Sequence, residues 1–403
     1  MQTVLAPFSS LRNKPFARLY TAETISLLGD AFTWVGIALL AYDLAKQQAA
    51  SILAIALTLR VSAFIVFAPL AGVWADRYPR RTILIVTHLG RMIVVSLFPF
   101  VTETWQVYGL IIGLNIFNAF FTPAYKATIP QFVTGGTDSK QAIALSNATY
   151  QLLGVLGPGL AGALAGLLGV QQIFWLDAIS FLLAGILIAT LPRSAWTRLP
   201  LPTASAETTT WQGIRNGTQW LFRQPAIRFS LLMEFIAALA GAQILVNTVG
   251  LVKGIMGQDD QHYGWVMSGF GVGATLAAFG VSRLTQRFRL PTIALFGALI
   301  ASLAILPAQE VSLIGLLILW AIAGMGQSLA EMPNQFLIAE RIPPAEQGRV
   351  YGAHFAWSHT WWAIGYPLAG WLGSRFTPQT FWIGGLIAMT CWLAATVALK
   401  RTT

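Results

Sequence analysis

Twelve long apolar stretches follow one another along this chain of 403 residues, and they constrain its fold more than any other feature. Each is close to the length of about 20 residues that a helix needs to cross a bilayer. Their approximate bounds are 18–43, 51–75, 83–101, 105–130, 141–168, 171–191, 226–251, 262–282, 290–307, 311–338, 348–374 and 380–399. Only 10% of the residues are charged and 56% are hydrophobic, which is too few charges to cover a soluble globule. The sequence therefore predicts an all-α polytopic membrane protein with twelve transmembrane helices.

The placement of lysine and arginine predicts how these spans are oriented. If the N-terminus is cytoplasmic and the spans alternate, only Lys46, Lys253 and Arg375 fall outside, and Arg60 falls within a span. The other 21 of the 25 basic residues then lie on the cytoplasmic side, as the positive-inside rule requires. We therefore expect both termini to be cytoplasmic.

Several classes of partner are not expected. The formal charge of +10 comes from basic residues in short segments between apolar runs, which form no basic face for nucleic acid. The single cysteine, Cys391, rules out a disulfide within the chain and a cysteine-based metal site. No phosphate-binding loop is present, which argues against an ATP-driven pump. We expect no metal and no cofactor.

Residues 192–225 interrupt the apolar rhythm with prolines, serines and threonines. We therefore expect two pseudo-symmetric six-helix bundles, at 1–191 and 226–403, joined by a cytoplasmic linker at 192–225. Four linker residues recur at helical spacing: Trp211, Ile214, Thr218 and Leu221. This spacing suits an amphipathic helix on the membrane surface, although an unstructured linker is the alternative.

The two halves also resemble each other in sequence. Lys-Pro-Phe-Ala-Arg-Leu at 14–19 precedes the first span as Gln-Pro-Ala-Ile-Arg-Phe at 224–229 precedes the seventh. Leu-Ala-Gly at 160–162 recurs at 368–370. A shared offset near 210 residues is what two parallel six-helix repeats would leave.

One acid and three arginines stand between the second and third spans, in the run Gly72-Val73-Trp74-Ala75-Asp76-Arg77-Tyr78-Pro79-Arg80-Arg81. We interpret this run as a loop at a membrane face. It resembles the G-x-L-a-D-R-x-G-R-R loop of the major facilitator superfamily, with Trp74 in place of a leucine and Pro79 in place of a glycine. The resemblance implies a cytoplasmic gate formed by Gly72, Asp76, Arg77, Arg80 and Arg81. The alternative is a charged loop that only sets topology.

The fifth span carries a dense glycine pattern, formed by Gly154, Gly157, Pro158, Gly159 and Gly162. It resembles the glycine-proline motif that antiporters of the same superfamily carry on helix five. Small residues allow close helix approach and proline bends a helix, so ordinary packing is the alternative. The arginine that many drug–proton antiporters place on helix four is absent from the fourth span.

Polar residues inside spans are costly in hydrocarbon and normally face a cavity or a partner. Glu23 and Asp30 lie seven residues apart on the first span and share one face. Shared faces are also expected for Asn115 with Asn118 and for Gln327, Glu331 and Asn334. The expected proton-coupling residues are Asp30, Glu23, Glu234 and Glu331. Asp30 either carries a proton or pairs with Arg60, whereas Asp177 and Glu23 lie nearer span ends and can reach water.

The resemblance implies that spans one, four, seven and ten line a central cavity. The candidate cavity residues are Trp34, Arg60, Asn115, Asn118, Tyr150, Phe235, Gln327, Asn334, Trp357 and Trp361. Aromatic walls beside acids suit bulky amphipathic or cationic cargo. The alternative for each aromatic residue is packing or a position at the membrane interface.

Short segments at 13–20, 26–30, 123–127 and 347–350 resemble the bacterial exporter branch that includes enterobactin exporters and macrolide efflux proteins. This resemblance implies a monomeric, proton-coupled exporter of a small amphipathic compound, such as a drug or siderophore, in the bacterial inner membrane. A lysophospholipid transporter of the same fold is the alternative. A membrane enzyme is a remote one, because the four histidines, His88, His262, His354 and His359, are scattered along the chain.

Overall fold

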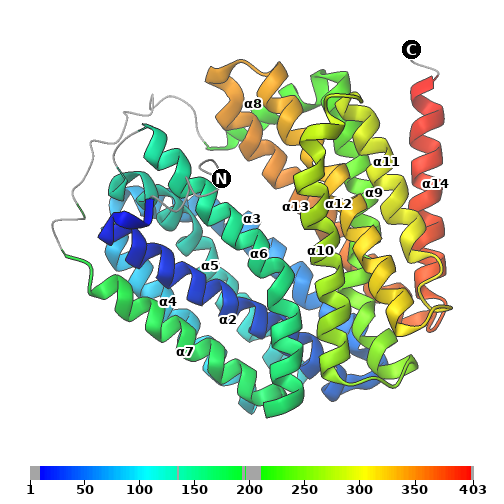
Figure 1. The fold of residues 1–403 in the computed structure, drawn as a ribbon, viewed down its shortest axis with the longest axis horizontal. Helices are drawn as coiled ribbons and strands as arrows, with labels where there is room; N and C mark the ends of the chain where they lie inside the picture. Colours follow the sequence, from blue (N-terminus) through cyan, green and yellow to red (C-terminus); the bar gives the residue numbers. More distant parts are fainter. Residues whose placement is uncertain (1–9, 134–135, 193–195, 197–209, 401–403) are drawn as a thin grey trace. The chain divides into compact units, whose positions relative to one another are not determined.

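A computed structural model describes residues 10–133, 136–192, 196 and 210–400, and these residues form helices and no strands (Figure 1). Twelve long helices overlap the twelve predicted spans one for one, so the predicted fold class is confirmed. They are α2 (Lys14–Ala45), α3 (Ala49–Arg77), α4 (Arg80–Leu97), α5 (Thr104–Phe132), α6 (Gly136–Leu168), α7 (Val170–Ala189), α9 (Pro225–Val249), α10 (Asp260–Leu284), α11 (Leu290–Ile305), α12 (Leu313–Arg341), α13 (Pro344–Arg375) and α14 (Thr380–Lys400). Within the described residues, nine helices are long and apolar enough to cross a membrane, and the apolar parts of α6 and α11 are shorter.

The chain packs as two compact units. The N-terminal unit comprises Met1–Ile37 and Ser62–Ala206, and the C-terminal unit comprises Ala38–Val61 and Glu207–Thr403. The division passes through α2 and α3, so one end of each of these helices packs with the C-terminal helices.

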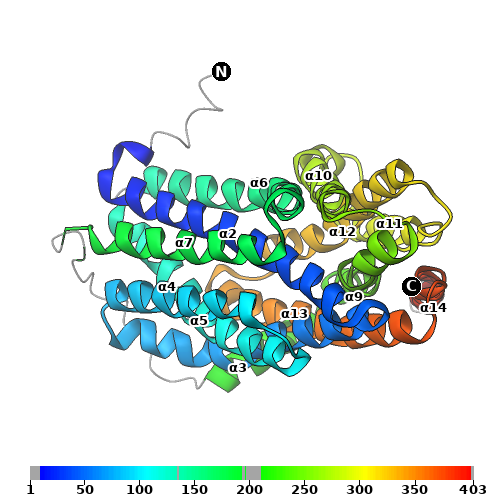
Figure 2. The same ribbon diagram turned by 90° about the horizontal axis from the view of Figure 1, so that it is seen from below.

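Close helix contacts hold each unit together. In the N-terminal unit, α2 runs beside α7 (Figure 2), and a Cβ atom on Gly29 would lie 2.1 Å from the Asp177 carboxylate. In the C-terminal unit, α10 crosses α12, and a Cβ atom on Gly273 would lie 1.7 Å from the Ala321 carbonyl oxygen. A side chain at either position would collide with these atoms of the neighbouring helix, so the two glycines allow the helices to pack this closely.

The predicted gate run is mostly helical, which corrects its interpretation as a loop. Helix α3 continues through Arg77 and α4 begins at Arg80, so only Tyr78 and Pro79 lie between the two helices. Proline disfavours the helical conformation for the residue before it, and Pro79 itself has φ −58° and ψ 120°. The turn is therefore confined to these two residues.

The described part of the linker contains a helix, α8 (Thr210–Arg223), so the alternative of an unstructured linker does not hold there. Leu221 is fully buried, and Thr218 accepts a hydrogen bond of 3.2 Å from Nε1 of Trp357 on α13. The Phe222 ring lies 5.2 Å from the Trp357 ring. Helix α8 therefore packs against α13.

Candidate functional site

Arg91 on α4 is the centre of a buried polar cluster in the N-terminal unit, with only 1% of its surface exposed. Its Nη1 lies 3.9 Å from Oδ2 of Asp30 on α2 and donates a hydrogen bond of 3.2 Å to Oδ1 of Asn118 on α5. Its Nη2 lies 2.9 Å from Nδ1 of His88, one turn earlier on the same helix. Three helices thus contribute polar atoms to one guanidinium group.

Two aromatic rings complete the surroundings of this cation. The guanidinium carbon of Arg91 lies 4.1 Å from the centre of the Phe121 ring and 4.4 Å from that of Phe181. Cation–π attraction is strongest for such desolvated contacts. The rings and polar groups together hold a charge that would otherwise be costly to bury.

Arg91 was missed as a buried residue because the count of basic residues assigned it to the cytoplasmic side. It lies eleven residues after Arg80 at the start of α4, which corresponds to about 16 Å along a helix. Its position inside the predicted span 83–101 was the signal that could have identified it. The structure therefore places Arg91, which the sequence analysis did not consider, beside Asp30.

Glu23 and Asp30 share a face of α2, and both interact electrostatically with Arg91. Oε2 of Glu23 is buried and has no hydrogen-bond partner within the described residues. Of the predicted cavity residues in this unit, Asn118 joins the cluster, whereas Asn115 donates to the Ile111 carbonyl of its own helix. Trp34 is half-buried, and 59% of Tyr150 is exposed.

Asp177 lies in the contact between α7 and α2, so the expectation that it reaches water is wrong. The residue is completely buried, and its carboxylate accepts hydrogen bonds from Thr33 and, at 2.9 Å, from Ser180. The missing side chain of Gly29 makes room for both Asp177 and Ser180. Asp177 therefore joins two helices.

Glu234 on α9 is the centre of a second buried cluster, in the C-terminal unit. Its exposed fraction is 3%, and its Oε2 accepts a hydrogen bond of 2.6 Å from Asn334 on α12. Nε2 of His354 on α13 lies 2.9 Å from the same oxygen. One turn before Asn334, Glu331 accepts a hydrogen bond of 2.5 Å from Gln327. The structure thus joins Glu234 to Asn334 and adds His354, which the sequence analysis had treated only as one of four scattered histidines.

Aromatic side chains form a row in the same unit. The Trp361 ring lies 4.9 Å from the Phe235 ring and 5.1 Å from the Trp357 ring. Nε1 of Trp361 is buried without a hydrogen-bond partner in the part of the chain that the structure describes. Arg60 interacts electrostatically with His359 and Tyr366 on α13.

The predicted gate motif and the glycine-proline motif of the fifth span both lie in the N-terminal unit. Nη2 of Arg81 donates a hydrogen bond of 2.6 Å to the Ala189 carbonyl at the end of α7, where cations are favourable. Arg80 lies in the first turn of α4, whereas the surroundings of Gly72 and the side chains of Asp76 and Arg77 are not among the described parts of the structure.

The fifth-span motif packs α6 against α2. A Cβ atom on Gly157 would lie 2.5 Å from Cβ of Ala31, which follows Asp30, whereas Gly154 has open space around it. Pro158 lies inside α6. Gly157 therefore brings α6 close to the helix that carries Asp30.

Lys253 is the centre of a charged network within the C-terminal unit. It lies in η5 (Gly250–Ile255), a π-helical turn, and hydrogen-bonds to Asp260 at the start of α10. Its Nζ also lies 3.7 Å from Asp43 and 5.2 Å from the centre of the Tyr42 ring, both near the end of α2. This network attaches the end of α2 to the C-terminal helices.

Replacing Lys253 with glutamine is expected to loosen this attachment. The Lys253 side chain is 13% exposed and that of Asp260 18%, so the change removes a shielded charge-assisted bond worth about 2 kcal/mol. The melting temperature of the purified protein should fall. Lys46→Gln is the matched control, because Lys46 is 65% exposed and lies 3.8 Å from the same Asp43. Equal melting temperatures for the two variants would contradict the expectation.

This chain is similar to known proteins over most of its length. The family model described as "Transmembrane secretion effector" matches residues 5–335. An uncharacterized MFS-type transporter of Bacillus subtilis (strain 168), YfiS, is 29% identical over 355 residues, which cover 84% of this chain and 82% of YfiS. The enterobactin exporter EntS of Escherichia coli O1:K1 / APEC is 26% identical over 422 residues, covering 99% of this chain and 96% of EntS.

Solved structures show the same fold. The nucleoside transporter NupG superposes with a TM-score of 0.77 at 14% identity, covering 96% of this chain and 99% of NupG. A bacterial homolog of the human lysosomal transporter Spinster, inward-facing and occupied, gives 0.73 at 16% identity, covering 96% and 97%. At these identities the likeness concerns the fold alone.

Proposed function

Because the chain belongs to the transmembrane secretion effector family of major facilitator transporters, we propose that it is a proton-coupled exporter of a small amphipathic compound. The match to the enterobactin exporter over nearly the whole chain supports export of a siderophore or a drug-like compound. The proposed location is the bacterial inner membrane, with both termini cytoplasmic. The protein would act as a monomer, without ATP or another cofactor.

The geometry around Asp30 is the observation on which proton coupling rests. Its carboxylate lies 3.9 Å from the Arg91 guanidinium, beyond the range of about 2.7–3.2 Å for a direct N–H···O hydrogen bond. Asp30 can therefore take up a proton without breaking a direct bond to Arg91. The cation keeps its contacts with Asn118 and the two aromatic rings meanwhile.

A second exchange site would be Glu234. Its Oε2 contacts both Asn334 and His354, so a carboxylate and an imidazole are joined directly by one hydrogen bond. Glu331 interacts electrostatically with both Glu234 and His354, so a charge change on one affects the others.

The aromatic row would contact the cargo. Trp361 has an indole N–H without an acceptor among the described residues, and its ring lies between those of Phe235 and Trp357. An amphipathic compound can stack on these rings while accepting a hydrogen bond from Nε1. Trp357 itself donates to Thr218 and packs against α8, so Trp361 is the stronger candidate for direct contact.

Transport in proteoliposomes tests the proposal. A panel of siderophores, macrolides, lipophilic cations and lysolipids is first screened for compounds that raise the melting temperature, since binding stabilises the folded state. Movement of the best ligand should then follow an imposed pH gradient, and a proton ionophore should abolish it. Transport at the same rate with and without the gradient would contradict proton coupling. A ligand that emerges chemically altered would contradict a transporter.

A further inference from the structure

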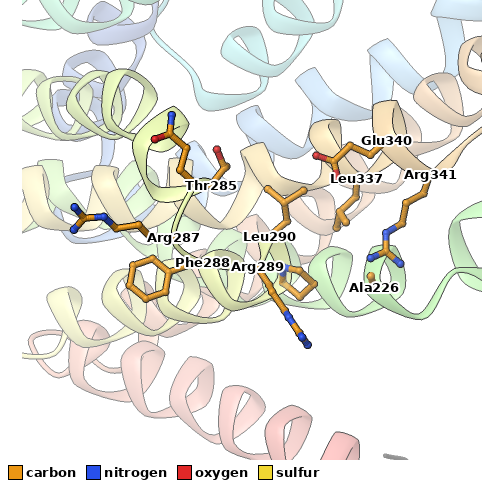
Figure 3. A pocket seen from close by; sticks show the side chains of 11 residues that line it. Ala226, Thr285, Arg287, Phe288, Arg289, Leu290, Leu337, Glu340 and Arg341 are labelled. Atoms are coloured by element: carbon orange, nitrogen blue, oxygen red, sulfur yellow. The ribbon is translucent and has the colours of Figure 1, made fainter.

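A pocket of about 660 Å³ opens at one end of the C-terminal unit, and Glu234 and His354 are not among the residues that line it (Figure 3). The start of α9, the segment between α10 and α11, and the last turns of α12 form its walls. Of the described residues that line it, three are arginines, Arg287, Arg289 and Arg341, and one is a carboxylate, Glu340. The pocket is therefore strongly basic.

None of these three arginines has a side-chain partner among the residues that the structure describes. The three side chains are exposed, and they form no hydrogen bond or ion pair with another residue that the structure describes. In Figure 3, Arg289 and Arg341 extend toward the α9 side of the pocket, whereas Arg287 extends to the opposite end. Their hydrogen-bond donors remain available to a ligand.

Two helix starts add to the positive potential. Both α9 and α11 begin at this pocket, each has a proline in its first turn, and neither has a side-chain cap. The first N–H groups of a helix carry partial positive charge when nothing caps them. Arginines beside helix N-termini form a setting that favours phosphate.

The corresponding segment of the N-terminal unit carries an arginine that already has an acceptor within the protein. Gly280 and Arg289 stand 208 residues after Gly72 and Arg81, close to the offset of the internal repeat. Arg81 is occupied, since it donates to the Ala189 carbonyl at the end of α7. Arg289 has no such acceptor among the described residues, so its donors can serve a ligand.

We propose that Arg289 and Arg341 bind the phosphate of an anionic phospholipid headgroup in this pocket. Phe288, which is 52% exposed, provides an apolar wall for the part of the lipid next to the phosphate, and the buried side chains of Leu290 and Leu337 line the pocket as well. This apolar wall favours a lipid over free phosphate. The three arginines also favour a headgroup with net negative charge over a zwitterionic one.

The test measures binding to the purified full-length protein by melting-temperature shift and by native mass spectrometry. The probes are short-chain phosphatidylglycerol, short-chain phosphatidylcholine and inorganic phosphate. Phosphatidylglycerol should bind to the wild-type protein more tightly than the other two. Arg289→Gln with Arg341→Gln should weaken it by on the order of a hundredfold, about tenfold per charged bond.

Two further variants keep the result interpretable. Arg215→Gln removes an exposed arginine of α8 that does not line the pocket, and it should leave phosphatidylglycerol affinity unchanged. Glu340→Gln removes the single carboxylate and should tighten binding, even if the double variant fails to fold. Unchanged affinity in both the double variant and Glu340→Gln would overturn the site. Inorganic phosphate binding as tightly as phosphatidylglycerol would overturn the lipid assignment.

Discussion

Replacing Arg91 with glutamine is expected to destabilise the protein strongly and to abolish transport. The change removes the cation that faces Asp30 and interacts with Glu23, and it leaves those acids without their buried partner. Breaking a buried charge pair by removing one partner costs about 3–5 kcal/mol of folding free energy. The melting temperature of the purified protein, measured in one detergent for all variants, should show this loss.

Three further variants assign the effect to the observed pair. Asp30→Asn keeps a polar side chain of similar size, and Arg91 keeps its contacts with Asn118 and the two aromatic rings, so this variant should lose less stability than Arg91→Gln while losing gradient-driven transport. Adding Asp30→Asn to Arg91→Gln should recover part of the lost stability, since one buried carboxylate is then neutral. Arg60→Gln should leave this N-terminal cluster intact. A wild-type melting temperature for Arg91→Gln beside a large loss for Arg60→Gln would assign Asp30 to Arg60 instead.

The helices could be predicted from the sequence because each span depends on its own composition. Twelve apolar runs predicted twelve helices, and recognising each run required no knowledge of how the helices pack. The ends of the helices were harder to predict from the sequence, because α3 continues to Arg77 where a loop had been expected. Charged residues in that run suggested a loop, but a helix can expose charges at its end at little cost.

Packing across helices was beyond the sequence. The end of α2 packs with C-terminal helices through Tyr42 and Asp43, which contact Lys253 about 210 residues later. Such non-local contacts leave no periodic signal. The same reason explains why Asp177 appeared to be a residue near water, since its hydrogen bond from Thr33 depends on how α2 and α7 approach.

For the candidate site residues, positions on one helix could be predicted, whereas partners on other helices could not. Helical spacing predicted the shared faces of Glu23 with Asp30 and of Gln327 with Glu331, and the hydrogen bond between the latter two agrees with it. Partners on other helices were missed: Arg91 for Asp30 and His354 for Glu234. A residue's own spacing says which face it occupies, whereas its partner depends on which helix covers that face.

Replacing Glu234 with glutamine is expected to separate proton coupling from cargo movement. Glutamine keeps an oxygen that can accept from Asn334, so about 1 kcal/mol of stability should be lost with the altered His354 contact. The amide cannot exchange a proton, and gradient-driven transport should fall by at least about tenfold, equivalent to about 1.4 kcal/mol. Exchange of labelled for unlabelled cargo at equal pH should continue, because it needs no net proton movement.

Glu310→Gln is the matched control for this change, since Glu310 is an exposed carboxylate between α11 and α12. It should leave both gradient-driven transport and exchange unchanged. If Glu234→Gln abolishes exchange and cargo binding as well, Glu234 contacts the cargo and does not serve only as a proton site. If the variant retains full gradient-driven transport, protons pass elsewhere, and Asp30 beside Arg91 becomes the first of the remaining candidates to test. The comparison of the two transport modes therefore distinguishes a proton site from a cargo site at the same carboxylate.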